Sequence, residues 1–219
     1  ASAEKYLVFE ANIIEAPTGA VRAVLEKAGT LPDHSALKTE LEQAEGSRSV
    51  FFGKTESRSG NRSKVHETSE IVYPVDFELA REKLITYSSE SEEWGTTIEF
   101  DPDLGADDIT IDLTYAVHND YAEPAFVHQP VFRLDESTVL MPTLKRSYAK
   151  TTTQLTLHSG STVLLGAWPA AVGADRNKML AAFAECHAVK NLPVLNDRLV
   201  ELLGQHGDTI AKVPEGKLQ

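Results

Sequence analysis

Seven histidines provide imidazole groups of the kind that commonly bind zinc. They stand singly, at positions 34, 66, 118, 128, 158, 187 and 206. No two of them are four residues apart, the spacing by which one face of a helix presents two imidazoles to a metal ion. We therefore expect these histidines to lie at the surface or to be hydrogen-bonded within the core, and we predict no zinc site.

The stretch from Asp101 to Asp108 has the composition of a calcium-binding loop. It places aspartates at 101, 103, 107 and 108 around Gly105, and calcium binds several carboxylate oxygens within a short loop. The glycine stands one position too early for an EF-hand, however, and no glutamate closes the loop. Because aspartate and glycine are also ordinary turn residues, we expect a turn between two strands. Calcium binding is the minor alternative, which calorimetric titration at millimolar calcium tests.

No arrangement of side chains in the sequence predicts a catalytic site. Arg58 and Arg62 stand beside a glycine in the polar segment 56–63, but their spacing matches no phosphate-binding loop, so we expect a solvated loop. The sequence contains neither a G-x-S-x-G motif nor a Gly-x-Gly run. Glu10 and Glu15 cannot be assigned as an acid–base pair from their spacing alone. We predict a protein that is not an enzyme, with no catalytic residue, no cofactor and no metal.

The charge and cysteine content exclude several classes of partner. The 219 residues include 33 acidic and 21 basic side chains, a net charge of −12, which argues against nucleic acid or an anionic membrane as the main partner. The single cysteine, Cys186, excludes an intramolecular disulfide, and we expect a packed thiol on a helix.

No segment approaches the ~20 apolar residues of a membrane-spanning helix. The opening Ala1-Ser2-Ala3 is compatible with removal of an export signal after an A-x-A sequence, which favours export.

Periodic apolar residues predict helices near both ends of the chain. After an opening strand over 5–15, we expect one helix over 18–28 and a second over about 33–45, each followed by a glycine. Apolar residues three and four apart predict a third helix over 175–188 and a last one over about 194–203, before a loose tail. We expect the first two helices to cover a sheet, because helices this short are not stable alone.

Alternating apolar and polar residues predict the strands between these helices. The clearest strand is 109–117, where apolar residues occupy every second position. It should pair with 94–100 across the aspartate-rich turn. Further strands are predicted over 48–55, 64–73, 125–133 and 138–144, with a polar turn over 118–124. The segment 76–87 fits neither period, so a short helix and a strand stay open for it.

The segment 147–168 predicts two strands folded back on each other. Apolar and polar residues alternate before Ser159-Gly160, and the apolar run Val163-Leu164-Leu165 follows. Serine–glycine is a turn dipeptide, because glycine accepts the positive φ that a tight hairpin needs. We expect a β-hairpin here, joined by the other strands in a single sheet.

In their order along the chain, these segments resemble the bacterial secretins, the outer-membrane channel proteins of type II and type III secretion and of type IV pili. A threonine-rich strand, a glycine turn and a return strand ending in VLLGA, over 147–168, are similar to the signature hairpin of that family. GTTIEFDP (95–102) and ITIDL (109–113) follow the order of two secretin strands and the turn between them. The opening strand 5–15, the segment 64–74 ending in IVYP, and the segment 125–133 ending in QPVFR resemble further secretin segments.

The resemblance implies a non-enzymatic structural or accessory component of a bacterial secretion or type IV pilus assembly system. It implies a location in the periplasm or at the outer membrane. Its partners would be proteins of the secretion or pilus apparatus, and further copies of the chain in a homo-oligomer, reached through exposed strand edges that add to a partner's sheet. No nucleic acid and no membrane-spanning segment are expected. The alternative is a small-molecule-binding or enzymatic α+β domain, with a pocket beneath the helices 18–28 and 175–188.

The predicted fold class is α+β, mainly an antiparallel sheet with helices packed on one face. An immunoglobulin-like β-sandwich with added helices is the alternative fold. The predicted domains are a secretin-like β-rich domain with two N-terminal helices over 1–170, a helical C-terminal extension over 171–207 and a tail over 208–219.

Overall fold

The chain folds into two antiparallel sheets and two short helices. The structure, a computed structural model, describes residues 5–80, 83–132, 138–170 and 177–189. In chain order, the elements are β1 (Tyr6–Pro17), α1 (Thr18–Ala28), α2 (Ser35–Gln43), β2 (Arg48–Arg58), β3 (Ser63–Ala80), β4 (Lys83–Leu104), β5 (Thr110–Phe132), β6 (Thr138–His158), β7 (Ser161–Pro169) and β8 (Lys178–Val189). The predicted antiparallel strands and N-terminal helices are confirmed, and the class is largely β.

Each sheet has four strands. Sheet A has the order β2-β1-β8-β7, and sheet B has the order β3-β4-β5-β6. All neighbouring strands are antiparallel. Sheet B is a simple meander, whereas sheet A joins distant parts of the chain, because β1 pairs with β8 from Tyr6↔Val189 to Pro17↔Lys178. The prediction of a single sheet is therefore wrong.

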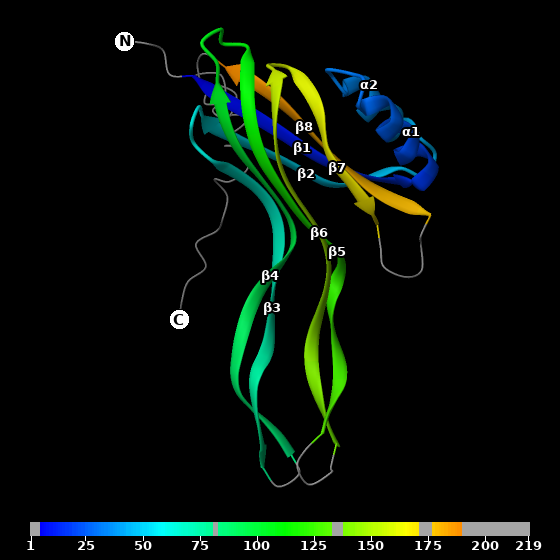
Figure 1. The fold of residues 1–219 in the computed structure, drawn as a ribbon, viewed down its shortest axis with the longest axis vertical. Helices are drawn as coiled ribbons and strands as arrows, with labels where there is room; N and C mark the ends of the chain where they lie inside the picture. The colour runs from blue at the N-terminus through cyan, green and yellow to red at the C-terminus, as the bar shows by residue number, and fades with distance from the viewer. Residues whose placement is uncertain (1–4, 81–82, 133–137, 171–176, 190–219) are drawn as a thin grey trace, which may run out of the picture.

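The body of the molecule has three layers, formed by the helices, sheet A and the upper part of sheet B (Figure 1). The main core lies between the two sheets, where Phe9 of β1 stacks on Phe100 of β4 with ring centroids 4.5 Å apart. A second core lies on the other face of sheet A, where Phe183 packs with buried residues of the two helices. The alternative prediction of two stacked sheets with added helices describes this part, although the meander of sheet B differs from an immunoglobulin-like connection.

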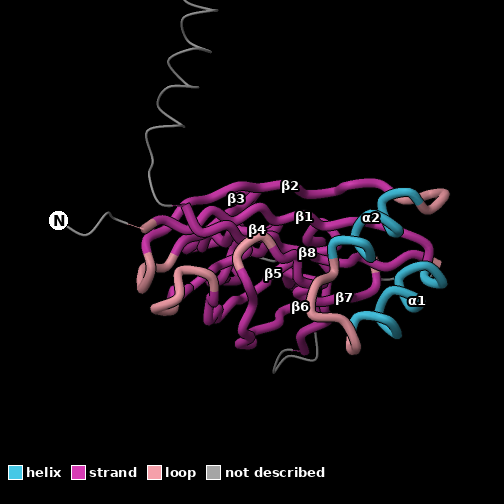
Figure 2. Tube along the Cα trace, turned by 90° about the horizontal axis from the view of Figure 1, so that it is seen from above, coloured by secondary structure: helices cyan, strands magenta, loops and turns pink. Residues whose placement is uncertain are grey.

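The two helices lie side by side at one end of the strands (Figure 2). Val21 and Val24 of α1 and Leu37 and Leu41 of α2 are buried against sheet A. Leu25, which has the spacing of the same apolar stripe, is 40% exposed. The helices thus cover sheet A through one narrow row of side chains each. Neither described helix has the length and hydropathy needed to cross a membrane.

The predicted helix over 175–188 is wrong, because Lys178–Val189 forms the strand β8 between β1 and β7. Leu180, Ala182, Ala184 and Cys186 belong to the core between the sheets, whereas Ala181 and Phe183 belong to the core under the helices. A strand buried on both faces has an unbroken apolar run, and an alanine-rich run also suits a helix. These residues are therefore part of sheet A and not of a helical extension. The predicted helix over 194–203 and the tail over 208–219 lie outside the described residues.

The predicted hairpin around Ser159-Gly160 is also wrong. The turn exists, and Gly160 has the expected positive φ of 86°. β6 before it pairs with β5, however, whereas β7 after it pairs with β8. The backbone N–H of Ser159 donates to Ile109 O beside sheet B, and that of Gly160 donates to Cys186 O in sheet A. The chain therefore crosses from one sheet to the other at this corner.

Two predicted connections differ from the structure, and the structure decides a third segment that the sequence left open. The expected turn over 118–124 is part of β5, with irregular register at Asp120, Ala122 and Ala125, where bulges keep the strand continuous. The expected loop over 56–63 shrinks to residues 59–62 between β2 and β3. The ambiguous segment 76–87 is extended on both sides of 81–82, so the strand interpretation is confirmed for the described residues.

Candidate functional site

Sheet B divides into two separate hairpins along its lower half (Figure 1). β4 and β5 pair from Leu104↔Ile111 as far as Thr96↔Asn119. Beyond that point, among the described residues, β4 pairs only with β3, and β5 pairs only with β6. We call the β3–β4 hairpin beyond Gly95 the acidic prong, the β5–β6 hairpin beyond Asn119 the apolar prong, and their point of separation the fork.

The two prongs differ in chemistry. The described strand residues of the acidic prong, 68–80 and 83–95, include six acidic and one basic side chain. In the apolar prong, the charged residues Asp120, Glu123, Lys145 and Arg146 lie close to the fork, whereas the described residues further out, 125–132 and 138–144, include no Asp, Glu, Lys or Arg. There Phe126 is 42% exposed and Leu140 is 58% exposed. Pro130, which the sequence places in an edge strand or a bulge, lies on β5 where that strand no longer pairs with β4, so one side of the strand is an open edge there.

A buried ion pair lies at the fork. The side chain of Asp120 on β5 is fully inaccessible to solvent, and its Oδ2 accepts a hydrogen bond of 2.9 Å from the backbone N–H of Gly95 on β4. Arg146 on β6 donates to both carboxylate oxygens of Asp120, over 2.6 Å from Nη2 and 3.1 Å from Nε. Its Nη1 lies 3.0 Å from Oε1 of Glu92 on β4. Arg146 therefore binds β5 and β4 at the same time.

The hydrogen bonds keep Asp120 ionised. Burial by itself raises the pKa of a carboxyl group, but the bonds from Arg146 and the Gly95 N–H outweigh it and hold the pKa of Asp120 below its ordinary value. The hydrogen bond to Asp120 in turn raises the pKa of Arg146. A buried carboxylate with these donors is fully paired, whereas removal of one partner would leave a charge without compensation.

A second set of hydrogen bonds connects the fork to sheet A. Asn119, which is buried, donates from Nδ2 to Thr96 Oγ1 at 2.7 Å. Its Oδ1 accepts a 3.0 Å hydrogen bond from the indole Nε1 of Trp168 on β7. Gly95 has φ 132°, and a Cβ at this position would collide with the backbone carbonyl oxygen of Glu67. Hydrogen bonds of Asn119 thus hold the fork to the core, and Gly95 allows β4 to approach the backbone of β3 closely at this point.

Sheet B leaves two long edges open. Among the described strands, β3 pairs only with β4, and β6 pairs only with β5. β3 has four acidic and one basic residue, whereas β6 has three basic and no acidic residue. The exposed charges include Glu67 and Glu70 on β3 and Lys145 and Lys150 on β6. The two open edges therefore carry opposite charge.

Sheet A has a covered edge at β7. The backbone of His34 donates to Thr162 O at 2.8 Å. The backbone of Thr162 donates to Oδ1 of Asp33, also at 2.8 Å, and Leu164 N donates to Nδ1 of His34 at 2.8 Å. The segment between α1 and α2 thus satisfies the outer hydrogen-bonding groups of Thr162 and Leu164 at the start of β7, and covering an edge with a loop is a common way to protect it.

The aspartate-rich turn is held by the chain itself. Asp107 accepts hydrogen bonds from the backbone of Ile109 and from the backbone and hydroxyl of Thr110, which lower the pKa of Asp107 to about 2. Asp108 pairs with Lys5, and Asp101 pairs with Arg62. Among the described residues, no group of three or more Asp, Glu, His or Cys side chains could hold a metal ion. A turn between the two strands is confirmed, but it covers residues 105–109 only, because Asp101 and Asp103 of the predicted turn belong to β4.

Glu10, Glu15 and Cys186 have structural roles. Glu15 binds Arg48 and Lys178, so that it links β1 to both neighbouring strands, whereas Glu10 binds Lys54. The thiol of Cys186 is buried between the sheets, on a strand and not on a helix.

The histidines do not form a cluster. His34, His118 and His187 have hydrogen-bond partners, whereas His66, His128 and His158 are exposed, and residue 206 lies outside the described residues. Sequence reasoning missed the fork altogether, because Asp120 and Arg146 lie 26 residues apart without a motif.

No deep pocket lies beneath the helices, where the described side chains form a packed apolar core. A surface depression lies instead on the outer face of sheet B, where Thr97, Glu99, Thr114, His118 and Lys150 line it. These side chains form part of a polar sheet face.

No family model and no curated protein sequence matches the chain. Among solved structures, the chain is similar to the secretin domain of InvG from the Salmonella SPI-1 injectisome, with 11% identity and a TM-score of 0.44, over 99% of this chain and 70% of that one. It is similar to a chain of the ETEC pilotin–secretin complex AspS–GspD, with 10% identity and a TM-score of 0.48, over 99% and 58%. A third match is the Klebsiella pneumoniae type II secretion outer membrane complex of PulD, PulS and PulC, with 11% identity and a TM-score of 0.47, over 98% and 45%.

InvG and the AspS–GspD complex are both described as secretins, the family that the sequence segments resemble. The chain spans between 45% and 70% of the length of these three chains.

Proposed function

We propose that this chain is a non-enzymatic structural component of a bacterial secretion or type IV pilus assembly system. It acts through protein–protein contacts in the periplasm or at the outer membrane. Its principal partner is a further copy of itself, which joins through the open edges of sheet B. Other proteins of the same apparatus bind the assembly.

The observation that carries this proposal is the pair of open, oppositely charged edges on one sheet. Four antiparallel strands place β3 and β6 in opposite directions. When β6 of one copy lies beside β3 of the next copy in the same orientation, the new pair is therefore antiparallel, like every other pair in the sheet. Such a head-to-tail contact extends the sheet from copy to copy, and it closes into a ring if the rotation between copies allows it.

Charge and hydrogen bonding both favour this contact. Unpaired N–H and C=O groups along an edge strand attract another strand, and opposite charges on facing strands stabilise the pair, whereas like charges weaken it. β3 against β3 would bring acidic residues together, and β6 against β6 would bring basic residues together. The charges therefore select β3 against β6.

Among the described strands, sheet A has one covered edge, β7, and one open edge, β2, whereas both edges of sheet B are open, as a head-to-tail contact requires. The β7 edge of sheet A is already bound by Asp33 and His34. The edges of sheet B have no comparable cover among the described residues. A protein that only needed to stay monomeric would gain from covering the longer edges first.

The secretion context rests on the order of the resembling segments. Their described residues lie in β1 (5–15), β3 (64–74), β4 and β5 (94–113), β5 again (125–132) and β6–β7 (147–168). The segments are thus distributed over both sheets of the fold. Fractionation of the native organism tests the location: recovery with envelope fractions supports the proposal, whereas recovery in the cytosol alone contradicts it.

Light scattering of the purified chain, combined with charge exchange at the two edges, tests the contact. We expect assemblies larger than a monomer for the parent chain. The double variant Lys145→Glu with Lys150→Glu should weaken them, because it places acidic residues on both edges. Adding Glu67→Lys with Glu70→Lys to the same chain should restore assembly, since the attraction is then reversed but intact.

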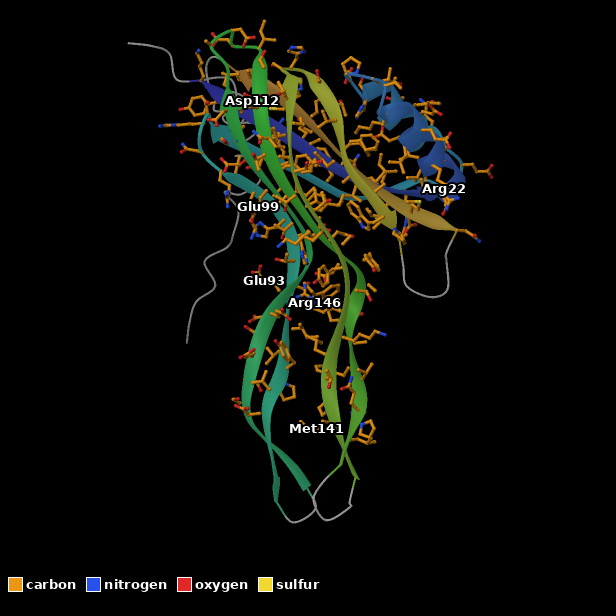
Figure 3. All side chains as sticks on the ribbon, in the orientation of Figure 1. Arg22, Glu93, Glu99, Asp112, Met141 and Arg146 are labelled. Carbon is orange, nitrogen blue, oxygen red and sulfur yellow. The ribbon has the colours of Figure 1, made fainter. Side chains whose placement is uncertain are left out.

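The matched control is Arg22→Glu, which makes the same kind of charge reversal on the exposed face of α1 (Figure 3). It should leave the mass unchanged. A monomeric parent chain at every concentration, or assemblies that are indifferent to the edge charges, would contradict the proposed contact.

A further inference from the structure

Arg146 lies at the point where the prongs separate (Figure 3). It is the junction of three strands, because it belongs to β6, binds Asp120 on β5 and reaches Glu92 on β4. Its side chain is only 16% exposed. An edge-strand arginine that served solubility alone would be expected to extend into water, so its inward position needs another explanation.

The contacts at the fork connect parts that the β-ladder does not connect. Backbone pairing between β4 and β5 stops at Thr96↔Asn119. Immediately beyond it, the only described bonds between the prongs are the Gly95 N–H to Asp120 and the Arg146 to Glu92 contacts. Two-stranded hairpins are only marginally stable by themselves and can bend about the point where they join a larger sheet. Side-chain contacts at the fork are therefore placed to control their relative position.

We propose that Gly95, Glu92, Asp120 and Arg146 form a clamp that sets the spacing of the two prongs. The clamp is a conformational element of the single chain and does not depend on the proposed assembly. Its fixed half is the buried Asp120–Arg146 pair, which locks the guanidinium in place. Its releasable half is the contact with Glu92, whose side chain is 45% exposed. Release of Glu92 lets the acidic prong swing away from the apolar prong while the body of the molecule stays folded.

The distance between spin labels on the two prongs tests the clamp. Val72 on the acidic prong is 63% exposed and Leu140 on the apolar prong is 58% exposed, so Val72→Cys with Leu140→Cys gives two accessible thiols. Cys186 is buried in the core and stays unlabelled in the folded chain. Diluting the labelled chain with unlabelled chain removes distances between copies, so the result is independent of any oligomer.

The clamp predicts a narrow distance distribution for the parent pair. Glu92→Gln should broaden it and move it to longer distances, and Arg146→Met should do so more strongly. Molar salt should broaden the parent distribution in the same direction, because it screens a partly exposed ion pair, and should have less effect once Glu92 is replaced.

Glu93→Gln is the control, because it removes the same charge from the next residue, which forms no ion pair with another described residue. A distribution for Glu92→Gln that matches that of Glu93→Gln would overturn the proposal. Glu92 is exposed enough that its replacement leaves the fold intact, which circular dichroism verifies. A change in prong distance in a monomer would support the clamp even if the edge contact proved wrong.

Discussion

Replacement of Asp120 by asparagine tests the energetic importance of the fork. The amide has the shape of the carboxylate, so the core is not emptied, and one oxygen can still accept the Gly95 N–H. The bidentate bond to Arg146 is lost. Removal of one partner from a buried ion pair costs about 3–5 kcal/mol. Because Arg146 keeps its contact with Glu92, we expect the lower end of that range, about 3 kcal/mol.

Urea unfolding followed by tryptophan fluorescence measures this loss. Trp168 is hydrogen-bonded to Asn119, the neighbour of Asp120, so its emission reports on the fork as well as on the core. With a dependence of about 1–3 kcal/mol per molar urea, the midpoint should fall by about 1 M or more. Asp112→Asn is the control, because it makes the same substitution on an exposed position of β5, and it should change stability by less than about 1 kcal/mol. Equal effects of the two substitutions would refute the reasoning.

Three further measurements follow from individual side chains. Because the pKa of Asp120 is lowered in the folded state, its carboxylate stabilises the fold above the ordinary carboxyl pKa of about 4. The difference in unfolding free energy between the parent and Asp120→Asn should therefore shrink as the pH falls below about 4. A constant difference down to about pH 2 would contradict this. Burial raises the pKa of the Cys186 thiol to about 12, so a thiol reagent at pH 8 should react only at the rate of unfolding, and prompt reaction of the native chain would show an open core. Gly95→Ala should strongly destabilise the chain, because the new Cβ would collide with the carbonyl oxygen of Glu67. In Gly19→Ala, on α1, the new Cβ meets no atom, and the substitution should stabilise the chain by about 0.5–1 kcal/mol. Chemical unfolding of the two variants compares these effects.

The sequence predicts local structure well where one face of an element is buried. Apolar periodicity predicts the bounds of α1, the presence of α2, and the pairing of the strands that contain 94–100 and 109–117, because each of these elements has one solvent-facing and one buried side. The register was not predicted, since 96–100 pair with 115–119. The same rule gave the wrong prediction for β8. Its residues are buried on both faces, so no alternation is left to distinguish a strand from an alanine-rich helix.

Pairing partners are less predictable than the strands themselves. Ser159-Gly160 has the residues of a hairpin turn, but a corner between two sheets needs the same positive φ at glycine. β7 pairs with β8, the strand that follows it in the chain, and not with β6, the strand before the turn. The ion pair at the fork could not be predicted for a related reason, since Arg146 and Asp120 are brought together only by the pairing of β5 with β6.

The join between β3 of one copy and β6 of the next is tested most directly by cross-linking of two different variants. Chains with Glu67→Cys on β3 are mixed with chains that have a cysteine on β6, at Lys145, Lys150 or Thr153 in turn, and then oxidised mildly. A disulfide needs Cα atoms about 4.4–6.8 Å apart, which facing strands provide at a matching register. The account predicts mixed dimers for at least one β6 position, with little cross-linking within either variant alone. No mixed dimer at any β6 position, with cross-linking only between identical variants, would contradict it.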